Sequence, residues 1–373
     1  MENNHLTYFK VENFKKFDAL EVNDIGQFNL IVGDNNVGKT CLLEALLVDE
    51  DPQQLLDNFW LSLKKRGLVF QIEEITKKVG NVSTTETIYP KENYFKKNII
   101  KEKQKESFFY IKDRNKENEI HISISNPISL AIYNLTKDKK DSVISKYGFE
   151  INIKENINQF IDIYNKKIKK ANNPLWIYDY NEGFINFPLI SFNDTPLEIE
   201  SRSIYENLKT KREKQILIDI LKVVNTKIVD VELREKFEDL KSVFLISFED
   251  KDEFVPLNFL GDGFKRIFYI ALKALSLKGK RILIDEIEIG IHYSKMKDFW
   301  VNIFNVCKEL DIQLFATTHS QECIEAYIEA SNDVGEKNIR LIRLQENKDK
   351  SIKAICYKEE YIEYMVESNT EER

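Results

Sequence analysis

A glycine-rich stretch near the N-terminus has the residue types and the spacing that phosphate binding requires. Residues 33–40 read Gly-Asp-Asn-Asn-Val-Gly-Lys-Thr, between the apolar runs 28–32 and 41–47. In a G-x-x-x-x-G-K-T loop, glycines let main-chain N–H groups surround phosphate oxygens, the lysine reaches the β and γ phosphates, and the threonine hydroxyl binds Mg²⁺. The sequence therefore predicts a site for ATP and Mg²⁺. Its expected nucleotide-binding residues are Gly33, Asn35, Asn36, Gly38, Lys39 and Thr40, with Thr40 also a metal ligand.

Two adjacent carboxylates, Asp285 and Glu286, follow the apolar run 281–284. Magnesium-dependent phosphoryl transfer needs such a pair beside a phosphate loop. We expect Asp285 to bind the metal, and Glu286 to orient the attacking water or accept its proton. A strand that ends in Asp-Glu is also typical of two solvated loop acids, and the phosphate loop favours the catalytic interpretation.

Two further segments are candidates for the γ-phosphate. Gly261, Asp262 and Gly263 (the signature segment) precede an apolar helical pattern, and their small side chains leave N–H groups accessible to an anion. His319 follows the apolar run 313–317, where its ring can hydrogen-bond a phosphate. Taken singly, the signature segment is also typical of a helix-starting turn, and His319 of an ordinary structural histidine.

In this order, the phosphate loop, the signature segment, the acid pair and His319 resemble the ATP-binding-cassette (ABC) arrangement of SMC-like ATPases, most of all the OLD-like AAA ATPases. Residues 11–17 and 285–292 share in the resemblance, which covers about 1–50 and 200–345. It implies that two subunits pair head to tail, so that Lys39 of one and the signature segment of the other enclose each ATP. It also implies that Glu286 and His319 are catalytic and that residues 289–292 form an inter-subunit loop.

The sequence departs from these relatives in two places. Gly261 and Asp262 stand where SMC-like proteins usually carry Ser and Gly. The glutamine that couples the site to the inserted region has no clear equivalent, and Gln71 is a weak candidate.

An α/β fold is expected to position these residues: an ABC-type P-loop NTPase with a helix-covered parallel sheet, N-terminal antiparallel strands and a mixed α/β insertion. Residues 1–50 and 201–373 are expected to form the two halves of the core, and 51–200 the insertion, a partner or coupling region. Strands are predicted at 6–11, 19–22, 28–32, 68–75, 108–124, 243–246, 255–257, 281–284, 313–317, 340–344 and 351–356. Helices are predicted from 39 and at 53–63, 154–170, 204–224, 264–277 and 295–310.

Composition narrows the class of protein. The 373 residues are 42% hydrophobic and contain no apolar run of about 20 residues, so we expect no membrane span. The first residues lack a basic region followed by an apolar one, which predicts a cytoplasmic protein. The four cysteines form no C-x-x-C pair, so neither a disulfide framework nor zinc is expected.

A net charge of −7 argues against a protein whose whole surface carries nucleic-acid-binding positive charge, although one local stretch is basic. Lysines and arginines alternate with aromatic residues over 91–118. A lysine-covered β-hairpin explains this pattern, since lysine commonly guards exposed strand edges. Nucleic-acid binding is the alternative.

The segment after His319 is too short for the Toprim-type nuclease domain that many OLD-like relatives carry. The chain thus resembles the stand-alone ATPase subunits of anti-phage systems, such as PARIS ATPases or RloA-like proteins. The leading hypothesis is a dimeric or larger ATP-driven switch that senses invasion and controls a separate effector, a nuclease or toxin. The alternatives are a RecF-like repair ATPase that clamps DNA, a nucleotide-stabilised scaffold and, least favoured, a transporter subunit.

Overall fold

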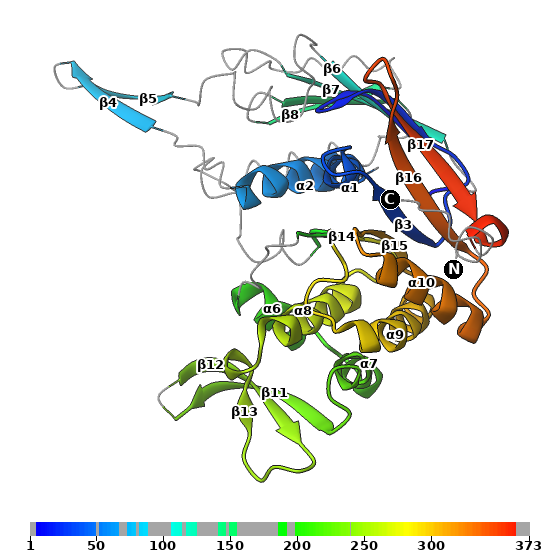
Figure 1. Cartoon of the computed structure of the whole chain (residues 1–373). Coiled ribbons are helices and arrows are strands. Elements are labelled where there is room, and N and C mark those ends of the chain that lie inside the picture. The colour runs from blue at the N-terminus through cyan, green and yellow to red at the C-terminus, as the bar shows by residue number, and fades with distance from the viewer. Residues whose placement is uncertain are drawn as a thin grey trace.

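In the part of the chain that the structure describes, two six-stranded sheets form the frame (Figure 1). The computed structural model describes residues 5–49, 52–66, 73–79, 82–88, 106–113, 117–124, 141–146, 149–154, 186–191, 198–238 and 240–362. One sheet is almost wholly parallel, with the order β10-β14-β15-β3-β16-β17. The other is antiparallel, with the order β2-β1-β6-β7-β9-β8.

The parallel sheet consists of β10 (Leu189–Ile190), β14 (Arg281–Ile284), β15 (Gln313–Thr317), β3 (Phe28–Gly33), β16 (Ile339–Glu346) and β17 (Ile352–Lys358). Only β17 runs antiparallel to its neighbour. Every residue of β3 and β15 is buried, as expected of strands that are covered on both faces. The predicted strands 28–32, 281–284 and 313–317 and the closing hairpin are confirmed.

Side chains alternate between two cores along these strands, one on each face of the parallel sheet. Leu30, Ile282 and Ala316 belong to the larger core, together with the helices α8 (Asp262–Ser276), α9 (Met296–Glu309) and α10 (Gln321–Val334). Ile31 and Leu283 belong to the second core, with α1 (Lys39–Ala45), α2 (Pro52–Lys65) and the antiparallel sheet. The parallel sheet is therefore packed between two cores, which hold it rigidly on both faces.

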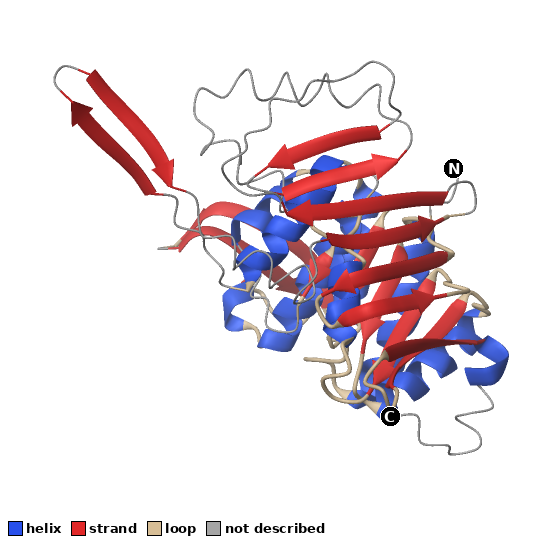
Figure 2. Cartoon of the chain, turned by 90° about the horizontal axis from the view of Figure 1, so that it is seen from above, coloured by secondary structure: helices blue, strands red, loops and turns tan. Residues whose placement is uncertain are grey.

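The antiparallel sheet joins the N-terminal strands to strands from the middle of the chain (Figure 2). Its strands are β2 (Phe17–Val22), β1 (Tyr8–Phe14), β6 (Glu106–Lys112), β7 (Glu117–Ile124), β9 (Phe149–Lys154) and β8 (Asp141–Lys146). β6 pairs directly with β1, with Val11 opposite Phe109. A hairpin of β4 (Glu73–Val79) and β5 (Val82–Ile88) projects away from this sheet in both views.

Two predictions about regular structure are wrong. The strands expected at 243–246 and 255–257 do not join the parallel sheet, because β12 (Leu240–Phe248) pairs antiparallel with β11 (Ile228–Phe237) and β13 (Val255–Pro256). A short hairpin closes locally, whereas a parallel pair needs a long crossover. The helix expected at 204–224 is two helices, α6 (Glu198–Glu206) and α7 (Lys211–Lys222), because Thr210 caps α7 in a capping box with Glu213.

Some predictions lie outside the described residues. These are Gln71, most of the helix expected at 154–170 and most of the basic stretch 91–118. The strand expected at 68–75 is described only from Glu73, where β4 begins. Within the described part of the chain, no helix is long and apolar enough to cross a membrane.

Candidate nucleotide and catalytic site

The ends of three adjacent parallel strands bring the predicted site residues together. β15 lies between β14 and β3 and is parallel to both. The phosphate loop follows β3, the acid pair follows β14, and His319 follows β15. Because carboxyl ends of parallel strands share one edge of a sheet, segments remote in sequence meet there.

The phosphate loop adopts a backbone that its glycines permit. Gly33 and Gly38 have φ angles of +138° and +114°, and Asn36 has +63°. A Cβ on Gly33 would lie 2.3 Å from the Leu344 carbonyl oxygen of β16, so a side chain there would displace the sheet. Gly38 is the N-cap of α1 and supplies no capping side chain, which leaves the N–H groups of the first turn available to phosphate oxygens.

The Lys39 ammonium lies across this loop. Its Nζ donates to the carbonyl oxygens of Gly33 and Asp34, at 2.6 and 3.0 Å, and lies 3.4 Å from Nδ1 of His319. Burial lowers the pKa of Lys39, whereas the carboxylates of Asp285 and Asp34 act in the opposite direction. Since an ammonium only donates, Nδ1 of His319 accepts, and a neutral His319 ring carries its proton on Nε2.

Thr40 and Asp285 form the candidate metal site. The Thr40 hydroxyl donates to both carboxylate oxygens of Asp285, at 3.2 and 3.0 Å, although the residues are 245 positions apart in the sequence. Neighbouring ligands of an octahedral Mg²⁺, each about 2.05 Å from the ion, lie about 2.9 Å apart. These oxygens therefore fit two neighbouring ligand positions, and water and phosphate oxygens suit the others. Asp285 is 3% exposed and also accepts a 2.7 Å hydrogen bond from the Thr317 hydroxyl.

Glu286 has an unusual main-chain conformation for a residue that is not glycine. Its φ is +50°, in the left-handed region. Its N–H donates to Oγ1 of Thr317 at 2.8 Å, and its carbonyl oxygen accepts from Arg266 at 3.1 Å. Burial raises the pKa of the Glu286 carboxyl, and the carboxylates of Asp285 and Glu288 raise it further. A carboxylate with a raised pKa suits proton transfer from water near neutral pH.

His319 is exposed, but residues that follow the acid pair hold the main chain around it. Its N–H donates to Oε1 of Glu288 at 3.0 Å. The main-chain N–H of Ile287 also donates to the Thr317 carbonyl, at 3.0 Å. These contacts tie the loop after β14 to the loop after β15, so Glu286 and His319 keep a defined relative position.

The signature segment contacts the loop after the acid pair. Gly261 is the N-cap of α8, again without a capping side chain, and the Asp262 side chain is 99% exposed. A Cβ on Gly263 would lie 2.3 Å from the carbonyl oxygen of Gly290. Within the described part of the chain, no hydrogen bond joins this segment to the phosphate loop. The signature segment therefore packs on Gly290 of the loop after the acid pair, whereas the hydrogen-bond partners of the Lys39 ammonium are Gly33, Asp34 and His319.

Large apolar side chains are exposed around these two segments. Phe259 is 77% exposed and Tyr293 is 72% exposed, with Ile289 at 36%. Phe259 lies in the 3₁₀ turn just before the signature segment, and Tyr293 begins the 3₁₀ turn after His292. Exposed aromatic side chains beside a candidate site are typical of a surface that another molecule covers.

The structure thus brings Gly33, Lys39, Thr40, Asp285 and His319 into contact and places Glu286 beside them. Asn35 and Asn36 lie exposed on the loop, and the Asn36 carbonyl accepts a hydrogen bond from Lys16.

Sequence reasoning missed the contacts of Arg266, Thr317 and Glu288. A buried arginine among the apolar positions of α8 was a signal for the first of these.

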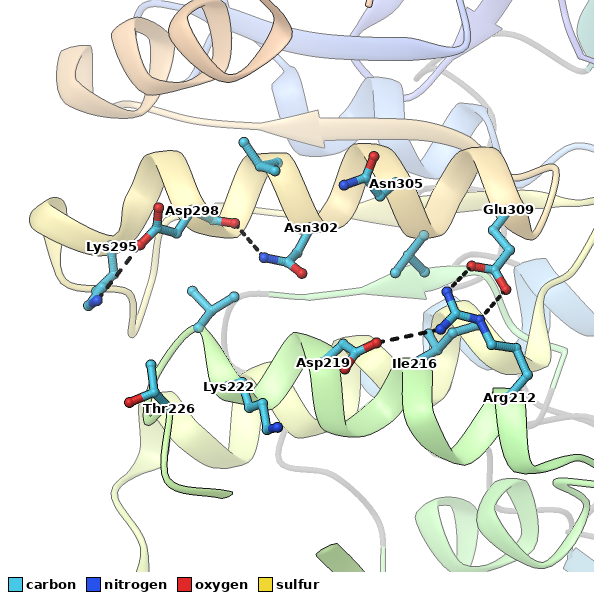
Figure 3. A pocket seen from close by; sticks show the side chains of 13 residues that line it. Arg212, Ile216, Asp219, Lys222, Thr226, Lys295, Asp298, Asn302, Asn305 and Glu309 are labelled. Atoms are coloured by element: carbon cyan, nitrogen blue, oxygen red, sulfur yellow. Dashed lines mark hydrogen bonds and ion pairs between the residues drawn. The ribbon is translucent and has the colours of Figure 1, made fainter. Parts of the chain in front are cut away.

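A groove of about 550 Å³ lies apart from this site, between α7 and α9 (Figure 3). Arg212 of α7 reaches across it to Glu309 of α9 at 2.5 Å and also faces Asp219 at 3.7 Å. No predicted site residue lines the groove. Its charged side chains pair largely with one another, so it adds nothing to the nucleotide site.

Comparisons with known proteins agree with this geometry. A family model described as "AAA domain, putative AbiEii toxin, Type IV TA system" matches residues 28–325, a range that includes the phosphate loop, the acid pair and His319. An ATP/GTP phosphatase of Helicobacter pylori is 25% identical over 344 residues, which is 85% of each chain.

Solved structures of Smc heads share the fold. An Smc head bound to the C-winged helix domain of ScpA has a TM-score of 0.54 at 14% identity, covering 96% of this chain and 99% of that one. An Smc head with an extended coiled coil from Pyrococcus furiosus has a TM-score of 0.52 at 12% identity, covering 98% and 100%. The ABC-type P-loop fold expected from the sequence is confirmed.

Proposed function

This chain belongs to the AbiEii-like family of AAA domains, and on that premise we propose that it is an ATP-driven switch that senses invasion and controls a separately encoded effector in anti-phage defence. Family and fold make it an ATPase of the ABC type. The control of an effector and the defence role are the proposed part. The family description, "AAA domain, putative AbiEii toxin, Type IV TA system", supports an action together with a second, separately encoded protein.

One observation carries the assignment of the site. The Thr40 hydroxyl of the phosphate loop lies 3.0 Å from the Asp285 carboxylate that ends β14. In the proposed mechanism Lys39 leaves the carbonyls of its own loop and binds the β and γ phosphates of ATP. Thr40 and Asp285 hold Mg²⁺, which supplies charge neutralisation on the phosphates when bound.

In this proposal Lys39, Thr40 and Asp285 bind the phosphates and the metal, whereas Glu286 and His319 act on the attacking water and the γ-phosphate. The Glu286 carboxylate accepts a hydrogen bond from the attacking water and can take its proton, as its raised pKa favours. His319, whose Nδ1 faces Lys39, offers Nε2–H to a phosphate oxygen. Glu288 holds the His319 main chain in place for this contact.

We further propose that two copies of the chain complete each other's sites. Within the described residues, no hydrogen bond joins the signature segment to the phosphate loop of the same chain, yet its N–H groups suit a γ-phosphate. In this proposal they bind the γ-phosphate of an ATP that is held by the phosphate loop of a second copy. Phe259, Ile289 and Tyr293 are exposed beside it and would become buried in such a dimer. Residues 51–200 remain the proposed partner or coupling region.

The ATPase site is tested by two variants that separate binding from chemistry. Lys39→Ala should weaken ATP binding, because it removes the charge that faces the phosphates. Glu286→Gln should keep binding and lower kcat by about 100-fold or more, because only the water-activating group is changed. Glu309→Gln is a matched control on the exposed end of α9. Equal hydrolysis by all three variants and the parent would contradict the assignment, and GTP should be measured beside ATP because the Helicobacter pylori relative is named for both.

The role of the switch is tested by capture from the native host. The Glu286→Gln protein, loaded with ATP, should retain a stoichiometric protein partner that Lys39→Ala does not retain. Retention of duplex DNA alone, with steep loss of affinity as salt rises, would instead favour the RecF-like clamp. Retention of neither would contradict the proposed control of an effector.

A further inference from the structure

Glu286 keeps a main-chain conformation that costs energy, so neighbouring groups must hold it. A residue other than glycine in the left-handed region is unfavourable and persists only where its surroundings determine it. The Thr317 hydroxyl accepts the Glu286 N–H on one side. On the other side, the Glu286 carbonyl oxygen accepts from the Arg266 guanidinium.

Arg266 binds the main chain around the acid pair at three points. Its Nη2 donates to the carbonyl oxygens of Asp285 and Glu286, at 2.6 and 3.1 Å, and its Nη1 donates to the carbonyl oxygen of Ser191 at 3.0 Å. The side chain is only 7% exposed. A planar guanidinium can serve several carbonyls with fixed directions, whereas a lysine ammonium is a single point of charge. The contact is therefore specific to arginine.

The same residue belongs to the helix that the signature segment begins. Arg266 lies one turn into α8, which starts at Asp262, and Gly263 packs directly on the Gly290 main chain. Because an α-helix transmits a shift of its first turn as a rigid body, a displacement at the signature segment moves the Arg266 guanidinium as well.

We propose that Arg266 is a positioning residue that sets the conformation of Glu286 and thereby links the first turn of α8 to ATP hydrolysis. This inference rests on the proposed role of Glu286 as the water-activating carboxylate. It predicts that the identity of residue 266 controls kcat, because the Arg266 guanidinium acts on the main chain of the acid pair. Binding of ATP depends on the phosphate loop instead and should not change.

The test compares Arg266→Lys and Arg266→Ala with Arg281→Lys. Arg281 is a matched control, because its Nη2 also donates to a main-chain carbonyl, that of Val48 at 2.6 Å, but from the opposite end of β14. Arg266→Lys should lower kcat by at least about tenfold, with KM for ATP within about twofold of the parent. Arg281→Lys should leave both constants near those of the parent. Millimolar guanidinium, far below the molar concentrations that unfold proteins, should restore part of kcat in Arg266→Ala.

Three results would overturn the inference: an unchanged kcat in Arg266→Lys, an equal loss of kcat in Arg281→Lys, or no rescue of Arg266→Ala by guanidinium. A purely structural role would lower the melting temperature and the fraction of the protein that binds ATP together, whereas the positioning role predicts a lower kcat with an unchanged ATP-binding fraction. The proposed ATPase site is judged separately, by Lys39→Ala and Glu286→Gln, so failure of one proposal is distinguishable from failure of the other.

Discussion

Thr317→Val tests whether a single buried hydroxyl holds both members of the acid pair. The Thr317 hydroxyl donates to Oδ1 of Asp285 at 2.7 Å and accepts from the N–H of Glu286 at 2.8 Å, and the residue is fully buried. Valine has nearly the same shape, so the change removes these two hydrogen bonds and little packing. The perturbation is therefore almost purely one of hydrogen bonding.

The magnitude follows from the two bonds. A hydrogen bond to a charged group contributes about 1.5–3 kcal/mol to stability and a neutral one about 0.5–1.5 kcal/mol. We expect the free energy of unfolding to fall by about 2–4.5 kcal/mol, their sum. Only an interaction that is stronger in the transition state than in the ground state contributes to kcat. We expect the bond that orients Asp285 to act mainly in the transition state, so its loss should lower kcat by about 10- to 100-fold, because about 1.4 kcal/mol corresponds to a factor of ten.

Initial rates of phosphate release, measured over a range of Mg²⁺ concentrations, provide the assay. Thr317→Val should need more Mg²⁺ for half-maximal rate, because Asp285 loses the donor that orients it. Thr317→Ser keeps the hydroxyl and should recover most of kcat. Ser331→Ala removes an equally buried hydroxyl, which donates to the Ile328 carbonyl near the end of α10, and should leave the rate unchanged.

The reasoning would be refuted if Thr317→Val kept the parent's kcat and Mg²⁺ dependence. It would also be refuted if Thr317→Ser were as slow as Thr317→Val, because the hydroxyl would then not be the cause.

Two further predictions concern the signature segment and the acid stability of the fold. Gly263→Ala should lower kcat by about tenfold or more, because a Cβ there would meet the Gly290 carbonyl oxygen at 2.3 Å and push α8 outward. Gly279→Ala is the control: it has open space around it but a φ of +68°, so it should cost stability through backbone strain and leave kcat unchanged. Equal kcat values for the two variants would contradict the contact. Burial raises the pKa of Glu213, but hydrogen bonds from Lys278 and two main-chain N–H groups outweigh it and lower the pKa to about 2. A carboxylate with a lowered pKa stabilises the fold above its ordinary pKa, so Glu213→Gln should cost about 1 kcal/mol at pH 7. In urea unfolding that difference should disappear as the pH falls from about 4.5 towards 2, and a difference that persists at pH 2 would contradict the prediction.

The sequence by itself determined the parts of this protein whose signals are local. The phosphate loop is recognisable because each of its positions has a separate requirement, and the structure shows the positive φ angles at Gly33, Asn36 and Gly38 that the motif implies. The buried strands 28–32, 281–284 and 313–317 are continuous apolar runs, so their existence followed from hydrophobicity alone. Their order along the chain and the fold family followed from the spacing of the motifs.

Tertiary structure alone decided which segments pair across long distances. Residues 243–246 pair with β11 and do not join the parallel sheet, and β6 pairs with β1. Such pairing depends on which strand edges remain free once the core has formed. The capping box at Thr210 divided one expected helix into two.

The contacts of Arg266, Thr317 and Glu288 with the acid pair and His319 were equally beyond the sequence. Each joins residues that are remote along the chain or lie on different elements, and each satisfies a main-chain or carboxylate group that is buried only in the folded state. These groups require hydrogen-bond partners only because the strand ends meet and exclude water from them. No periodic pattern or motif in the amino-acid sequence marks such contacts.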